Sequence, residues 1–218
     1  MAVVDPSLED ALDEWFIEAL NGLARSPHPG IDGVLQRVVA EREITGTRGV
    51  CDLHVVRCDG NGRPQVRALV RHLTERIIDY CIPQGRIDEA AAYFDQGRSG
   101  AAWVRLNREA RALFVDADTT GELGELLLFA LLEELVGAPQ VLSKISLKTN
   151  SRVHYHGVDG VHVRARIDGG IDLYWGEAKI YASFGAAVSS CFKSLDGSDN
   201  PPLARQDPRR CDSWSVGS

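Results

Sequence analysis

Apolar residues recur every three or four positions near the start of the chain, and this spacing predicts helices. The segment 7–25 is the clearest case. Its apolar positions are Leu8, Leu12, Trp15, Phe16, Leu20 and Leu23. Further helices are predicted at 31–44, 69–80 and 86–96. Strands are predicted at 49–58, 64–68, 101–106 and 111–115, with a turn at 59–63.

The pattern of apolar and polar positions is clearer between residues 121 and 195. The segment 121–137, GELGELLLFALLEELVG, is mostly apolar, so we expect a helix that is buried among other elements. Strands are predicted at 141–148, 158–167 and 171–180, followed by a helix that begins after Ser183. The sequence Asp168-Gly169-Gly170 between the last two strands predicts a hairpin. The fold class is therefore α/β (α+β), and this region runs helix, strand, hairpin, helix.

The charge distribution changes the expectation about partners. The chain has 218 residues and a net charge of −7, which argues against binding nucleic acid, because phosphate binding is mostly electrostatic. Residues 1–139 carry 14 Lys+Arg against 23 Asp+Glu, whereas residues 140–195 carry 7 against 4. The basic character is therefore local, and all four lysines lie in this segment: Lys144, Lys148, Lys179 and Lys193.

Composition also limits the class of protein. No apolar run approaches the roughly 20 residues that a membrane span needs. The acidic start of the chain lacks the pattern of a secretory signal, so we expect a cytoplasmic protein that does not bind membranes. The five cysteines are scattered and form no close Cys-x-x-Cys pair, so reduced thiols are expected.

Strand periodicity places three charged residues on apolar faces. Alternation along 158–167 puts Asp159 on the face of Val161 and Val163, and alternation along 171–180 puts Glu177 and Lys179 on an apolar stripe. Both stripes are expected to face inward. Burying charge without a partner is costly, so these residues should share a cation or pair with one another.

The hairpin predicts how the two strands pair. If Asp168-Gly169-Gly170 is a three-residue loop, Asp159 lies opposite Lys179 and Val161 lies opposite Glu177. The two carboxylates are then diagonal neighbours, roughly 7 Å apart. Two oxygen ligands at that separation can bind one Mg²⁺ or Mn²⁺ ion.

Two groups beside the predicted carboxylate pair would complete a hydrolytic site. The carbonyl of Ala178 is a candidate third ligand of the cation. Lys179 can orient or deprotonate a water and stabilise charge on a phosphate. The simpler alternative is an ion pair between Lys179 and Asp159 or Glu177 at a sheet edge.

Other polar residues are weaker candidates. Glu125 lies in the first turns of the apolar helix and could be a further metal ligand, or it could be a solvated helix N-terminus. Lys144 and Lys148 could bind phosphates, or they could line a solvated strand face. His162, on the opposite face from Asp159, could contact nucleic acid. A zinc site made by His154, His156 and His162 has no suitable fourth ligand.

Four motifs of this region resemble a known family. GELGELLLFALL (121–132), SKISLKTN (143–150), GVDGVHVR (157–164) and YWGEAKIY (174–181) are similar to HamA, the nuclease component of the Hachiman antiphage defence system, within the PD-(D/E)xK superfamily. The resemblance implies a restriction-endonuclease-like core, a mixed sheet flanked by helices, after a helical N-terminal region. It further implies Mg²⁺-dependent DNA cleavage controlled by a partner helicase, HamB. Carried over by position, Glu125, Asp159 and Glu177 would be metal ligands, and Lys179 the catalytic lysine.

The expected organisation has three parts. Residues 1–118 form a mixed α/β region that docks the partner, residues 119–195 form the nuclease core, and residues 196–218 form a disordered or non-native tail. The expected enzyme is a Mg²⁺-dependent deoxyribonuclease. The alternatives are a non-catalytic subunit that binds and controls a helicase, and a small-molecule metallohydrolase.

Overall fold

The computed structural model describes residues 30–115, 121–143, 159–166 and 170–195, together with Trp15, residues 18–20 and Gly22. The first half contains the 3-10 helix η1 (Ile31–Gly33), strands β1 (Leu35–Glu43) and β2 (Val50–Val56), and helices α2 (Val66–Glu75), α3 (Ile77–Cys81), α4 (Gln84–Asp95) and α5 (Ala101–Val115). The second half contains α6 (Gly121–Leu131), the π-helix η2 (Leu132–Val136), β3 (Gln140–Ser143), β4 (Gly160–Ala165), β5 (Ile171–Gly176) and α8 (Phe184–Leu195).

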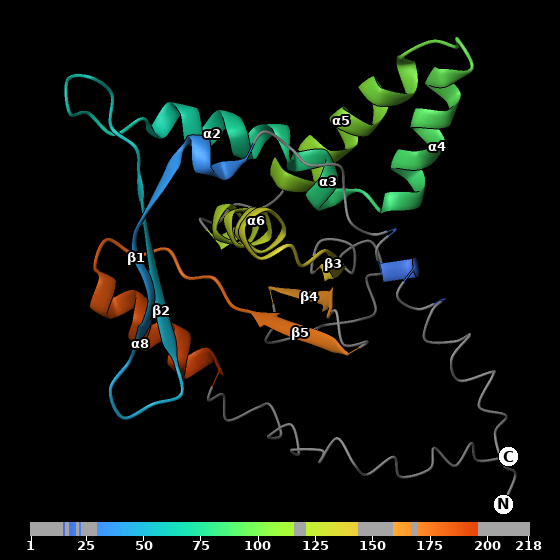
Figure 1. Ribbon diagram of the computed structural model, residues 1–218. Coiled ribbons are helices and arrows are strands. Elements are labelled where there is room, and N and C mark those ends of the chain that lie inside the picture. The colour runs from blue at the N-terminus through green and yellow to red at the C-terminus, as the bar shows by residue number, and fades with distance from the viewer. Residues whose placement is uncertain are drawn as a thin grey trace, which may run out of the picture.

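Helix α6 lies between the helical part and the second sheet. In Figure 1, α2 and α3 lie on one side of α6, and strands β3, β4 and β5 lie on the other. The chain is a mixed α+β protein, as predicted. Among the described residues, both the β1–β2 pair and the three-stranded sheet β3-β4-β5 are antiparallel, so the expected mixed sheet is not seen there.

The hydrophobic core explains the central position of α6. Its sequence is apolar almost all round, and Leu126, Phe129 and Ala130 are at most 2% exposed. These residues belong to one cluster of buried side chains that extends back to Ile31 and includes Tyr80 of α3. A helix that is apolar on every face is stable in water only when other elements cover it, and here both the helices and the sheet do so.

Four predicted elements of the first half are wrong. The segment 31–44 is rich in helix-forming residues, yet most of it forms β1, which pairs with β2 from Leu35 to Glu43. The predicted strand 64–68 instead overlaps the start of α2. The predicted strands at 101–106 and 111–115 are parts of the single helix α5. Strand pairing outweighed the local pattern in β1, and packing against the core did so in α5.

The spacing of buried residues explains why residues 101–115 form one helix instead of two strands. Leu106 and Ala110, four positions apart, are both buried, which is the period of a helix face. Helix α5 packs this face against the core cluster.

The described residues of the predicted helix 7–25 are helical, and the predictions for 49–58, 69–80 and 86–96 agree with β2, with α2 and α3, and with α4.

The end of the apolar helix carries a buried network of charges. Arg76 is 2% exposed, and its guanidinium contacts Glu133 at 2.7 Å and Glu134 at 3.3 Å in η2. His72 of α2 contacts Glu134 at 2.9 Å. A π-helix is rare in proteins, and this one places two consecutive glutamates toward the α2–α3 side. The network ties the helical part of the chain to the end of α6.

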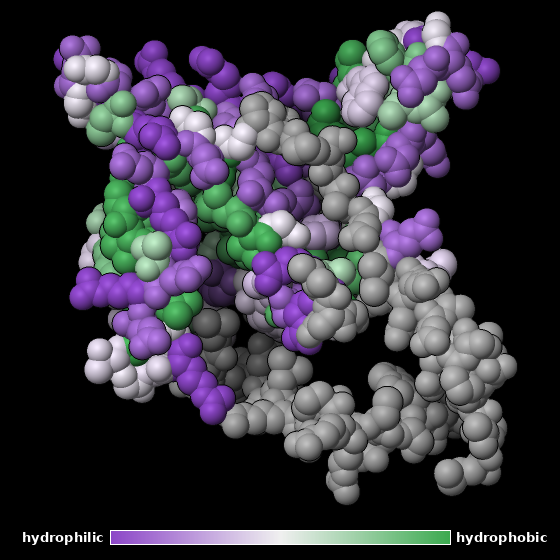
Figure 2. All heavy atoms as spheres, in the orientation of Figure 1, coloured by the Kyte–Doolittle hydropathy of each residue, from purple (hydrophilic) through white to green (hydrophobic). Residues whose placement is uncertain are grey.

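The surface of the described part mixes polar and apolar areas. Apolar side chains are exposed along the β1–β2 hairpin, including Val38, Leu53 and Val55, on the left of Figure 2. None of the described helices is both long enough and apolar enough to cross a membrane.

Candidate functional site

The pairing of β4 with β5 corrects the predicted register. Val161 pairs with Trp175 and Ala165 with Ile171, whereas the sequence predicted Val161 opposite Glu177. The Arg166 N–H also donates to the Gly170 carbonyl at 2.7 Å. The turn is therefore centred one position earlier than predicted. Because this moves the pairing by two residues rather than one, the same residues still share a face of the sheet.

Glu177-Ala178-Lys179 does not lie within a strand. Strand β5 ends at Gly176, and the three residues follow it without regular secondary structure. Asp159 precedes the first residue of β4, and its N–H donates to the Gly176 carbonyl at 3.1 Å. The Ala178 N–H in turn donates to Asp159 Oδ2 at 2.9 Å. Asp159 therefore fixes the path of the chain just beyond β5, in a segment that was predicted to belong to the strand 171–180.

The two carboxylates and the lysine form one electrostatic cluster. Lys179 Nζ bonds to Glu177 Oε1, and the two side chains are 25% and 7% exposed. The hydrogen bond that Lys179 donates to Glu177, together with the charges of Glu177 and Asp159, holds the pKa of Lys179 above its ordinary value. Burial raises the pKa of the nearby Cys191 thiol in α8, and the Lys179 charge opposes this effect. The end of the β4–β5 hairpin thus brings Asp159, Glu177 and Lys179 together, as the sequence predicted.

The apolar stripe of β5 faces the opposite way from the prediction. Ile171, Leu173 and Trp175 were expected to face inward, but they are 47%, 59% and 43% exposed. Helix α6 covers the other face of the sheet, where a Cβ added to Gly176 would lie 2.7 Å from Leu128 Cδ2. The absence of a side chain at this position lets the apolar helix approach the sheet closely.

The expected exposure of His162 to nucleic acid is also wrong. His162 has no exposed surface, and its ring lies 6.1 Å from that of Phe129 in α6. Its Nδ1 lies 2.8 Å from the Ala138 carbonyl oxygen, so the ring is also hydrogen-bonded inside the protein. A side chain enclosed in this way is part of the packing between α6 and β4, and it does not offer a surface to nucleic acid.

Helix α6 crosses the Glu177–Ile180 segment at a glycine. A Cβ added to Gly124 would lie 3.3 Å from the Ala178 Cβ and 3.2 Å from Ile180 Cγ1. Glu125, the next residue, is 7% exposed. The alternative in which Glu125 is a solvated helix terminus is therefore wrong, since the carboxylate is buried.

One hydrogen-bond partner of Glu125 comes from the helical part of the chain. Tyr80 of α3 donates its hydroxyl hydrogen to Glu125 Oε2 at 2.8 Å. Burial and the Glu125 charge hold the pKa of Tyr80 far above its ordinary value, so the hydroxyl remains a donor. Sequence reasoning missed Tyr80, because no local pattern relates it to a carboxylate 45 positions away.

The oxygen donors of this cluster suit a hard divalent cation. Mg²⁺ is usually bound by one or two carboxylates, with water and substrate oxygens completing its shell, and Asp159 and Glu177 supply two carboxylates. The described residues hold no group of three or more His, Cys, Asp or Glu side chains placed to bind a metal.

Four predicted residues lie outside the described part of the chain: Lys144, Lys148, His154 and His156. Their predicted roles therefore stay predictions.

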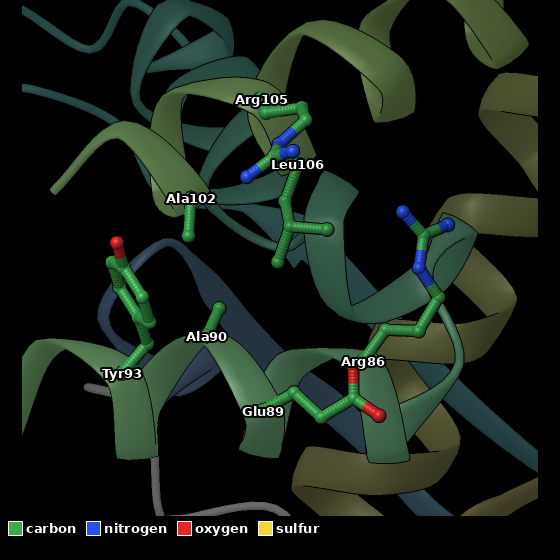
Figure 3. Close-up of a pocket in the computed structure, with 7 residues that line it drawn as sticks. All are labelled: Arg86, Glu89, Ala90, Tyr93, Ala102, Arg105 and Leu106. Carbon is green, nitrogen blue, oxygen red and sulfur yellow. The ribbon is translucent and has the colours of Figure 1, made fainter.

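Two cavities lie away from the carboxylates. One, of about 320 Å³, separates α4 from α5, and Figure 3 shows Tyr93 and Ala90 of α4 facing Ala102 and Leu106 of α5 across it. The other, of about 620 Å³, lies between the β1–β2 hairpin and the end of α6 and includes Arg164 of β4. Neither is lined by a residue of the predicted site.

A comparison with protein families identifies the relatives of this chain. The family model described as HamA matches residues 33–210, which is most of the chain. The chain belongs to the HamA family. HamA membership places it in Hachiman antiphage defence. No curated protein and no solved structure matches the chain.

Proposed function

We propose that this HamA chain is a metal-dependent deoxyribonuclease that hydrolyses phosphodiester bonds of DNA when a partner helicase licenses it. The observation that carries the proposal is the cluster at the end of the β4–β5 hairpin. Asp159 binds the backbone of Ala178 at 2.9 Å, and its charge acts on Lys179 together with that of Glu177. Two carboxylates beside a cationic lysine are the groups that metal-assisted phosphodiester hydrolysis needs.

The residues have separate roles in this proposal. Asp159 and Glu177 would hold Mg²⁺ or Mn²⁺, with the Ala178 carbonyl and Glu125 as further ligands. The cation, when bound, would polarise the phosphodiester and lower the pKa of a water molecule. Lys179, whose pKa is raised by its hydrogen bond to Glu177, would orient or deprotonate a water and stabilise charge on the phosphate.

Control by a partner is physically reasonable for this chain. The net charge of −7 limits free binding to DNA, and the lysines are confined to the segment of the site. A helicase that brings DNA to the cluster would overcome this repulsion locally. The region 1–118 is the proposed docking surface for that partner.

A plasmid-cleavage assay with Mg²⁺ or Mn²⁺ and the partner helicase tests the proposal. We expect Glu177→Ala and Lys179→Ala each to reduce cleavage at least 100-fold, because oriented charge at a phosphate contributes several kcal/mol. Lys193→Ala is the matched control, since Lys193 is an exposed lysine of α8, and it should cleave like the wild type. If wild type and all three variants are equally inactive with the helicase present, the chain is a non-catalytic regulatory subunit.

A further inference from the structure

Helix α2 presents a row of arginines to solvent. Arg67 and Arg71 lie about one helical turn apart in α2, and Arg63 lies three residues before the helix begins. All three residues are exposed, and α2 runs along the upper edge of the molecule in Figure 1. Within the described part of the chain, no carboxylate forms an ion pair with any of them. Arg63, Arg67 and Arg71 are called the α2 arginine row below.

The charge of this row is unusual for its half of the chain. Residues 1–139 carry 14 Lys+Arg against 23 Asp+Glu, yet residues 57–75 carry four arginines against two acidic residues. Two other exposed arginines of this half, Arg37 and Arg86, contact carboxylates. The α2 arginine row is therefore a local positive surface whose charge is not used inside the chain.

The row does not stabilise the helix that carries it. Arg67 lies in the first turn of α2, where the helix dipole makes a positive charge unfavourable. That turn contains no acidic residue. Val66 and Val70, the neighbours of the two helical arginines, are 53% and 49% exposed, so half of their surface does not pack against the core. This face of α2 is thus available to a partner.

The chain holds the row in a fixed position. Asp59 Oδ1 accepts hydrogen bonds from the N–H groups of Asn61 and Arg63 at 2.8 and 3.0 Å. The Asp59 N–H donates to the Arg63 carbonyl at 2.9 Å, which closes the turn before α2. Elsewhere on the helix, His72 and Leu73 are buried. A surface fixed in this way loses little conformational freedom when it binds a ligand.

We propose that the α2 arginine row contacts the phosphate backbone of duplex DNA, as a second DNA-binding surface outside the cluster of Asp159, Glu177 and Lys179. Guanidinium groups can bind phosphate oxygens through two parallel hydrogen bonds. Arg67 and Arg71 are about 6 Å apart along the helix axis, so both can contact one strand. Such contacts fix the position of a duplex without reading its sequence. The inference rests on the proposed function only in taking DNA as the ligand, since binding needs no cleavage.

Fluorescence anisotropy of labelled duplex DNA with the full Glu177→Ala chain measures this contact without cleavage. A combined Arg63→Gln, Arg67→Gln and Arg71→Gln variant should bind about 10-fold or more weakly at low salt. The slope of log affinity against log salt should fall by about three, because each phosphate contact contributes about 0.9. The loss should be the same for duplexes of unrelated sequence.

The matched control removes three exposed arginines that already have contacts in the chain. Arg37 and Arg86 contact carboxylates, and the Arg98 guanidinium lies 5.0 Å from the centre of the Tyr93 ring. Replacing these three arginines by glutamine changes the net charge equally, and it should lower the salt slope by less than about one. An equal loss of affinity in the two triple variants would show that only net charge matters, and it overturns the inference.

Arg67→Glu separates DNA binding from folding. A carboxylate in the first turn of α2 suits the helix dipole, so this variant should unfold at no lower temperature than its Glu177→Ala parent. We still expect its affinity for duplex DNA to fall, because a phosphate contact is replaced by repulsion. This variant also decides the matter if the glutamine variant does not fold. Unchanged DNA affinity in Arg67→Glu overturns the inference.

An acidic surface on the partner helicase is the other ligand that such a row could bind. If the glutamine variant binds DNA as the control does but no longer binds the helicase, the inference is overturned. If Lys144→Ala with Lys148→Ala weakens DNA binding and the glutamine variant does not, only the inference is rejected and the proposed function stands. If the Glu177→Ala chain binds no DNA even with the helicase, DNA as the ligand of the proposed function is wrong as well.

Discussion

Lys179 has a pKa that its neighbours raise. The largest cause is the hydrogen bond that Lys179 donates to Glu177, followed by the charges of Glu177 and Asp159. A lysine whose pKa is raised by folding stabilises the folded state below its unfolded pKa of about 10.4, and that contribution is lost as the pH rises through the folded value. The ion pair is therefore fully formed at neutral pH.

Replacing Glu177 should lower the raised pKa of Lys179. In Glu177→Ala, the pKa of Lys179 is expected to fall toward the ordinary lysine value, because the largest cause has been removed. The ¹³Cε chemical shift of Lys179, followed against pH by nuclear magnetic resonance, measures the change. Lys193→Ala serves as the assignment control and should leave the titration of Lys179 unaltered. A Lys179 titration that is the same in Glu177→Ala and the wild type would contradict the ion pair.

Two helical glycines offer a matched test of the contact at Gly124. Nothing lies within 4 Å of a Cβ added to Gly85 in α4, whereas one added to Gly124 meets Ala178 and Ile180. Gly85→Ala should raise the free energy of unfolding by up to about 1 kcal/mol, since alanine favours a helix. Gly124→Ala should be less stable than Gly85→Ala by about 1–3 kcal/mol through overpacking. Urea unfolding of both variants measures the difference. An equal gain in the free energy of unfolding would contradict the close approach of Gly124 to Ala178 and Ile180.

At the scale of elements, the buried charges joining α2 and α3 to η2 are expected to stabilise the chain strongly. Arg76→Met leaves Glu133 and Glu134 buried beside each other without the guanidinium, and we expect a loss of about 3–5 kcal/mol. Arg86→Met removes an exposed pair with Glu109, which should cost about 0–1 kcal/mol. Urea midpoints of the two variants provide the comparison. A loss for Arg76→Met as small as that for Arg86→Met would show that the network contributes little.

The elements of residues 121–195 were more predictable than those of the first half. The apolar segment 121–137 and the glycine-rich turn of the hairpin are strong local signals, because they favour one backbone conformation whatever packs around them. The segment 31–44 carries no such signal. Its residues suit a helix in isolation, and only pairing with β2 makes it a strand. Pairing with a neighbouring strand cannot be read from the pattern of one segment alone.

At the scale of the whole molecule, the separation of charge along the chain should govern DNA binding. The basic segment 140–195 includes Lys144 and Lys148, the proposed phosphate contacts. In an inactive Glu177→Ala background, the affinity for duplex DNA should fall steeply with salt. Replacing both lysines by alanine should reduce the slope of log affinity against log salt by about one per lysine. Fluorescence anisotropy over a salt series measures the slope, and Lys193→Ala should preserve it.

The sequence by itself determined which residues carry the candidate chemistry. Asp159, Glu177 and Lys179 could be selected because alternation along two predicted strands marked them as charged residues on apolar stripes. The family motifs lie in the same segment, and the HamA match includes it. The predicted alternation did not place them correctly, because Glu177 and Lys179 follow the end of β5 and the apolar stripe of that strand is exposed.

Only the tertiary structure decided which face of the sheet is covered and what orients the carboxylates. The face of β4 with Gly160, His162 and Arg164 is the polar one in the sequence, so the pattern could not show that α6 packs on the side of His162 and leaves the apolar stripe of β5 exposed. Nor could it bring Tyr80 to Glu125. Such contacts depend on how an all-round apolar helix is enclosed by distant segments, and that is decided when the whole core packs.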